Sequence, residues 1–220
     1  GTARKRAGLI VPPAASAPVR GYGAGSIRTD ETHMRIVLLS CLLAVAGAAS
    51  ATSPADAFWD RFEPLCGKAF EGRLVQEPAG DNGFAGKRLV MHVRDCAQDR
   101  IRIPFAVGED LSRTWVLTRR GDRIELKHDH RHADGTPEEV TRYGGTAANA
   151  GRADAQYFPA DEETRQVIEY AFSNVWSMRF ESDASFSYGV QRLGTDRVFR
   201  VDFDLSREVE APPAPWGWKN

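Results

Sequence analysis

Arg123-Ile124-Glu125-Leu126-Lys127-His128-Asp129-His130-Arg131-His132 is the stretch that decides the fold, because apolar or histidine side chains alternate in it with charged ones. Successive side chains of a β-strand point to opposite faces of the sheet. The charged face must look at water, so the face that carries Ile124 and Leu126 looks at a core. The alternation predicts a half-buried strand whose core face ends in His128, His130 and His132.

Similar short segments with period-two alternation lie on both sides of this stretch and are separated by Gly, Asp and Pro. The expected strands are 68–76, 88–96, 100–107, 112–119, 123–132, 139–143, 175–180, 185–193 and 197–205. Two helical segments are expected: a short one over 58–65, and a late one that begins after the N-cap Asp161 and carries an apolar stripe to Phe172. Residues 144–155 are expected to form a loop. About nine antiparallel strands with one late helix predict an all-β domain, first as an up-and-down barrel and second as a sandwich.

A small barrel either fills its interior with side chains or holds one small ligand. The candidate ligand-binding residues are therefore the three histidines of the strand together with Trp115 and Tyr188. Two other interpretations of the histidines stay open. They are structural residues at a strand end that emerges into a polar turn, or they bind a metal ion.

A divalent metal would be bound by histidines two positions apart, whose Cβ atoms lie about 7 Å apart in a strand. The pair would be His128 and His130, which we prefer, or His130 and His132. The third ligand would come from His92, Asp134, Glu138 or Glu139. No nucleophile elbow, phosphate-binding loop or dinucleotide fingerprint occurs in the chain,. The sequence therefore favours a protein that is not an enzyme and assigns it no cofactor.

The stretch that begins at Met34 has the three parts of an export signal. Arg35 is a short positive region, residues 36–45 are apolar, and Ala49-Ser50-Ala51 is a small-residue cleavage site. Four parts are expected: a leader or over-long start over 1–33, a signal peptide over 34–51, a β domain over 52–207 and a Pro/Trp-rich tail over 208–220. The expected location is periplasmic or extracellular, and the mature form contains no membrane span.

The mature part is mildly acidic. Residues 1–51 hold six of the 29 basic and two of the 30 acidic residues, which leaves 23 and 28 and a net charge of about −5. The sequence contains no basic patch of the kind that would indicate a nucleic-acid partner. Two of the three cysteines, Cys66 and Cys96, remain after residue 51, and export to an oxidising compartment predicts a disulfide between them,.

Four stretches, namely Phe84–Val93, Ser112–Thr118, Leu126–Gly135 and Ala211–Gly217, resemble a group of uncharacterised exported proteins of Gram-negative bacteria. The resemblance spans most of the mature part and implies export, but no activity. The strand layout is also similar to that of calycin-type barrels, although Gly67-Lys68-Ala69-Phe70 lacks the tryptophan of the lipocalin motif. This second likeness concerns the fold alone.

The sequence leaves three functions open. The first is binding of a small, partly apolar ligand inside the barrel. The second is a metal-dependent enzyme that uses the histidine strand. The third is a structural or inhibitory envelope protein that acts through its surface and its tryptophan-rich tail.

Overall fold

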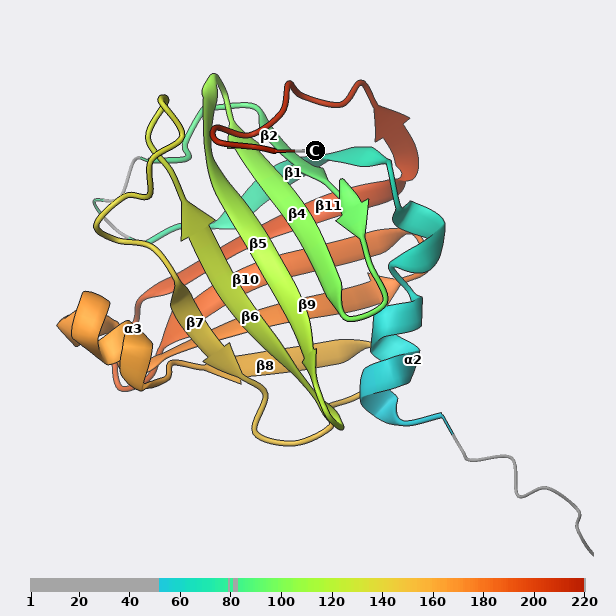
Figure 1. The fold of residues 1–220 in the computed structure, drawn as a ribbon, viewed down its shortest axis with the longest axis vertical. Coiled ribbons are helices and arrows are strands. Elements are labelled where there is room, and N and C mark those ends of the chain that lie inside the picture. The colour runs from blue at the N-terminus through green and yellow to red at the C-terminus, as the bar shows by residue number, and fades with distance from the viewer. Residues whose placement is uncertain (1–51, 79, 81–82, 220) are drawn as a thin grey trace, which may run out of the picture. The chain divides into compact units, whose positions relative to one another are not determined.

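The computed structural model describes residues 52–78, 80 and 83–219, and these residues form a curled antiparallel β-sheet (Figure 1). A helix, α2 (Pro54–Asp60), precedes the sheet, and a second short helix, α3 (Glu162–Val167), interrupts it. Short 3₁₀ turns follow them at Glu63–Leu65 and Glu169–Ala171. The strands are β1 (Ala69–Gln76), β2 (Leu89–His92), β3 (Asp95–Cys96), β4 (Arg100–Val107), β5 (Asp110–Arg120), β6 (Arg123–His130), β7 (Tyr143–Thr146), β8 (Ala155–Pro159), β9 (Asn174–Ser182), β10 (Ser185–Arg192) and β11 (Val198–Val209).

The strand order confirms the up-and-down barrel over the sandwich. Along the sheet the order is β7-β6-β5-β4-β2-β1-β11-β10-β9-β8, with β3 paired to β4 alone. Apart from β3, strands next to each other in the sheet are neighbours in the sequence, and the first and last strands, β1 and β11, pair with each other. The ring is nearly closed where β7 meets β8.

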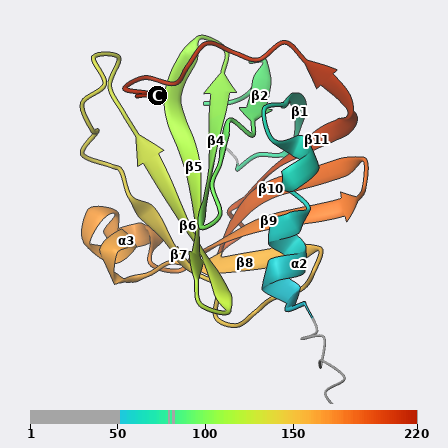
Figure 2. The same cartoon turned by 45° about the vertical axis from the view of Figure 1, so that its right-hand side comes forward.

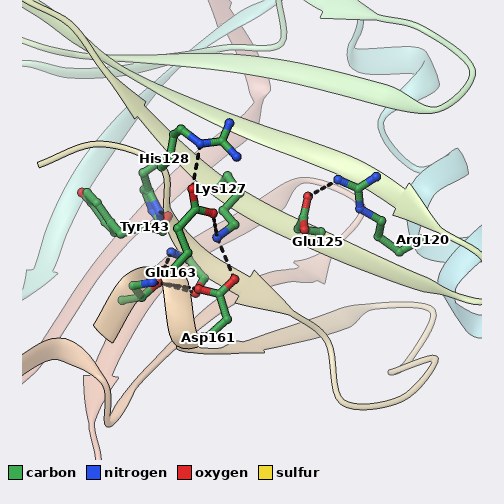
Figure 3. A network of polar contacts seen from close by, with 10 residues as sticks. Arg120, Glu125, Lys127, His128, Tyr143, Asp161 and Glu163 are labelled. Atoms are coloured by element: carbon green, nitrogen blue, oxygen red, sulfur yellow. Dashed lines mark hydrogen bonds and ion pairs between the residues drawn. The ribbon is translucent and has the colours of Figure 1, made fainter. Parts of the chain in front are cut away.

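The meeting of β7 and β8 is held by α3, and we call it the seam. The backbone N–H of Asp161 donates to the carbonyl of Gly144 at 3.0 Å. The hydroxyl of Thr164, which is fully buried, accepts from the N–H of Gly144 and donates to its carbonyl, both at 2.7 Å. Lys127 of β6 reaches Asp161 and Glu163 at 2.6 Å each (Figure 3). Backbone and side chains of one short helix therefore replace a strand ladder at this point.

The two helices lie at opposite ends of the barrel (Figures 1 and 2). At the α2 end, four phenylalanine rings fill the interior, and we call them the phenylalanine cluster: Phe58, Phe62, Phe180 and Phe186. Neighbouring rings of the cluster have centroids 5.1–5.7 Å apart, and most of them meet edge to face, which is a favourable geometry for aromatic rings,. None of the four side chains is more than 5% exposed.

β6, the strand from which the fold was predicted, has the expected buried face except at its end. Ile124, Leu126 and His128 of β6 are buried on the core side. Lys127 is the exception on the outer face, because the seam covers it. β6 ends at His130, so the expected strand to residue 132 is too long by two residues.

The region 139–159 differs most from the prediction. The expected strand over 139–143 is wrong, since the strand there is β7 and begins only at Tyr143. β8 lies in a region for which no strand was expected. The late helix has only six residues, and the far end of its expected apolar stripe, Tyr170 and Phe172, is exposed.

Two further expectations concern the cysteines and the tail. Cys66 and Cys96 are joined in a disulfide with their Cα atoms 6.2 Å apart. β11 continues to Val209, and the rest of the tail folds back onto the domain, with Pro215 buried and the Trp218 ring 3.8 Å from the guanidinium carbon of Arg102.

The expected leader and signal peptide, residues 1–51, lie outside the described residues. No helix within the described part of the chain has the length and apolar character needed to cross a membrane.

Candidate functional site

The interior is not filled at the α3 end. A cavity of about 210 Å³ lies there, bounded by the core faces of β5, β6, β9 and β10 and by the segment that follows α3. Larger hollows of up to about 450 Å³ occur on the surface, but the largest is a groove along β1, β10 and β11 lined by outward-facing charged side chains such as Arg73 and Asp204. The cavity in the barrel is therefore the candidate site.

An aromatic stack forms one wall of the cavity. Trp115 of β5 stacks on Tyr188 of β10 with ring centroids 4.2 Å apart, and Phe105 stacks on Trp115 at 4.8 Å. β5 and β10 are five places apart in a ring of ten strands. Opposite walls of the barrel are thus in contact, so the cross-section is flattened and the free space is confined to one end.

His128 is held across the barrel by two hydrogen bonds. Its Nδ1 lies 3.0 Å from the carbonyl of Tyr143, and its Nε2 lies 2.7 Å from the hydroxyl of Tyr188. A carbonyl can only accept, so Nδ1 carries the proton and Nε2 accepts the hydroxyl proton of Tyr188. Burial lowers the pKa of His128 to about 3 and raises that of Tyr188,. The pair is therefore neutral at physiological pH.

A second tyrosine–histidine pair lies beside the first. The hydroxyl of Tyr143 is 3.0 Å from Nε2 of His130. The ring of Tyr143 stacks on His128 with centroids 4.4 Å apart, and Figure 3 shows these two side chains next to each other. Burial, helped by the charge of Arg113, lowers the pKa of His130 to about 4,. Burial also raises the pKa of Tyr143. We call these four residues, His128, His130, Tyr143 and Tyr188, the Tyr–His site.

The structure brings together four of the five residues predicted from the sequence to bind a ligand. Trp115, Tyr188, His128 and His130 all line the cavity. His132 does not, because it lies beyond the end of β6. Its backbone N–H binds the carbonyl of Thr136 in the turn that follows. The expected row of three inward-facing histidines is therefore a row of two.

The predicted metal pair lacks a third ligand in the described part of the chain, where no group of three His, Cys, Asp or Glu side chains is suitably placed for a metal ion. Both ring nitrogens of His128 are already engaged. Among the proposed third ligands, Glu138 is close, with Oε2 3.7 Å from Nδ1 of His130. His92 binds the carbonyl of Gly67 instead, and Asp134 caps the turn at Thr136.

Several residues around the cavity were not predicted. They include Tyr143 and three arginines: Arg113, Arg192 and Arg197. The alternation of side chains along two strands that were expected from the sequence could have identified two of these arginines. Arg113 shares a face with Trp115, and Arg192 shares a face with Tyr188, because the residues of each pair are separated by an even number of positions.

Fold and site together define a small up-and-down β-barrel with a cavity at one end, walled by aromatic rings and two neutral tyrosine–histidine pairs. Comparison of the chain with known protein families, with curated proteins and with solved structures finds no match.

Proposed function

We propose that this chain is an exported protein that binds a small, partly apolar ligand in the cavity at the α3 end of its barrel. The observation that carries the proposal is the contrast within one interior. The α2 end is closely packed with phenylalanine rings, whereas the α3 end keeps about 210 Å³ free beside the Tyr–His site.

The size of the cavity limits the ligand. Sites for drug-sized molecules usually measure about 300–1,000 Å³. A cavity of about 210 Å³ has the volume of roughly seven water molecules at the density of the liquid,. The cavity therefore suits a molecule that contains one aromatic ring or two fused rings.

The chemistry of the walls supports a ligand that is partly apolar. The Phe105–Trp115–Tyr188 stack provides apolar surface, and the hydroxyl of Tyr188 retains lone pairs after donating its proton to His128,. An apolar body with a small number of polar groups would match such walls, as in most small-molecule sites.

The state of the histidines favours binding over catalysis. A general acid or base works best when its pKa lies near the operating pH. The pKa values of His128 and His130, about 3 and about 4, are far below neutrality. The alternative of action through the tail has less support, since Pro215 is buried and Trp218 packs on Arg102 of the same domain.

Export rests on the expected signal peptide that begins at Met34, and the Cys66–Cys96 disulfide is compatible with it,. The location would be the periplasm or the medium, where the barrel would meet small molecules before they enter the cell.

Blocking the cavity tests the proposal. Val190 of β10 lines the cavity, and the neighbouring Gln191 is exposed on the other face of the strand. We expect 2-naphthol to bind the wild type at one site by calorimetry and to shift the NMR signal of the Trp115 indole N–H. Val190→Trp should weaken this binding at least about tenfold, which corresponds to about 1.4 kcal/mol.

The matched control is Gln191→Trp, which adds the same side chain to the outer face and should leave the affinity unchanged. Absence of binding to the wild type would count against the proposal. Equal affinities of the two variants would show that the ligand binds elsewhere.

A further inference from the structure

The charged side chains that line the described part of the cavity are basic. Among the residues that the structure describes, the lining contains Arg113, Arg192 and Arg197 and neither Asp nor Glu. The mature chain as a whole carries about −5, so this positive cluster is a local feature and does not follow from composition.

We infer that the cavity binds a small organic anion, an aromatic or similarly flat carboxylate whose ring lies against the aromatic walls and whose carboxylate binds Arg192. The inference rests on the proposed ligand binding and specifies the class of ligand.

Arg192 is held at the mouth by the end of β10. It shares the inner face with Tyr188 and Val190, and its backbone N–H binds the carbonyl of Arg197 at 3.0 Å in the turn to β11. Both arginines of this turn therefore lie on the same side of the cavity.

The partners of Arg192 leave its charge uncompensated. In the described residues these partners are the amide oxygen of Asn174, which accepts from Nε at 3.1 Å, and the ring of Tyr170, which lies 4.8 Å from the guanidinium carbon. Both are neutral. The bond to Asn174 uses only one of the five N–H groups of the guanidinium, and a carboxylate could accept two of the others side by side.

A second arginine, Arg113, lines the opposite wall of the cavity. It lies on β5, on the same face as Trp115, and its guanidinium carbon is 5.7 Å from the centre of the Phe84 ring. It differs from Arg192 in that it already has an ion-pair partner, Asp110. The charge of Arg113 is therefore balanced by Asp110, and Arg192 would bind the anion directly,.

The test uses three probes of equal size and shape that differ in charge: benzoate, benzamide and benzamidinium. We expect the wild type to bind benzoate about tenfold more tightly than benzamide, in line with a charge-assisted hydrogen bond. Benzamidinium should bind more weakly than benzamide. Arg192→Gln should abolish the preference for benzoate and leave the affinity for benzamide within about twofold.

Two controls accompany the test. Arg179→Gln removes one positive charge from the outer face of β9, where Arg179 pairs with Glu181, and should leave the preference intact. Arg192→Lys keeps the charge but loses the planar fork, so it should retain part of the preference. Thermal unfolding of each variant shows whether the domain is folded.

Equal binding of all three probes to the wild type, or a preference that survives in Arg192→Gln, would overturn the inference and leave ligand binding itself intact. No binding of any probe also overturns it. In that case the 2-naphthol titration shows whether ligand binding fails as well.

Discussion

At the α2 end of the barrel the buried rings of the phenylalanine cluster pack against one another, whereas at the α3 end the Tyr–His site lies beside a cavity. Both ends are built on the same strands, since β9 and β10 pass from one to the other. Apolar burial at the first end stabilises the domain without specific bonds. At the second end each buried ring nitrogen of His128 needs a partner, and the backbone and Tyr188 provide them. The difference suggests that stability and binding are divided between the two ends.

The largest expected effect comes from breaking the apolar end. Phe62 is fully buried and its ring contacts three other rings of the cluster. We expect Phe62→Ala to lower the free energy of unfolding by about 3–5 kcal/mol, because the lost burial and the remaining cavity both destabilise. Urea unfolding followed by tryptophan fluorescence measures this. Phe172→Ala, at a side chain 61% exposed, should change stability by less than about 0.5 kcal/mol,. A loss below about 1 kcal/mol in Phe62→Ala would show that the cluster is not the main stabilising region.

The polar end should respond to pH. The pKa of His128 is about 3 in the folded protein and about 6.5 in an unfolded chain, so the unfolded chain binds more protons between these values,. The contribution of His128 to stability is therefore complete above pH 6.5 and is lost as the pH falls toward 3,. Between pH 7.5 and pH 5 the loss is roughly 2 kcal/mol for this histidine.

His128→Phe separates this effect from other titrations. The variant is expected to be less stable than the wild type at pH 7.5, because the carbonyl of Tyr143 loses its donor,. Its further loss between pH 7.5 and pH 5 should be smaller than that of the wild type by roughly 2 kcal/mol. His130 remains and continues to titrate. Equal losses in the two proteins would mean that His128 is not held neutral by the fold.

The smallest expected loss of stability comes from removing one hydroxyl group, that of Tyr188. Tyr188→Phe removes the donor to Nε2 of His128, while Nδ1 stays bound to the carbonyl of Tyr143. One buried acceptor is left without a partner, which costs about 1–2 kcal/mol. Chemical denaturation of the variant measures this. Tyr157→Phe, at a half-exposed tyrosine of β8, is the control and should be nearly neutral. A neutral Tyr188→Phe would argue against the assigned direction of the hydrogen bond.

Much of the fold could be predicted because the strands carry a clear two-residue period. β6 and β11 alternate so regularly that their inner faces are evident from the sequence. β7 and β8 were not recognised for a physical reason. β7 contains Gly144 and Gly145, which look like loop residues, yet a Cβ at Gly145 would lie 1.8 Å from the carbonyl oxygen of Pro159. Glycine is needed there because the two ends of the sheet approach closely, and such an approach is not visible in local sequence.

The site was predictable to the extent that it follows from alternation. The same rule that placed His128 on the core side also places Trp115 and Tyr188 there. Their contact could not be predicted, because it depends on how strongly the barrel is flattened. Tyr143 was missed for a related reason: it pairs with His128 across the β6–β7 ladder, and the start of β7 was misplaced. His132 was included because the end of a strand is less certain than its period.

At the seam, two neighbouring strands are joined by the peptide chain but not by a strand ladder. β1 and β11, the two ends of the domain in the sequence, are joined by a ladder, whereas β7 and β8 are linked by the chain through residues 147–154 and by the bonds of α3. The peptide connection therefore lies where backbone pairing is sparsest. It acts as a tether that keeps the two edges at a high effective concentration. A proteolytic cut within it would leave every ladder intact and still remove the advantage of closing the ring within one molecule.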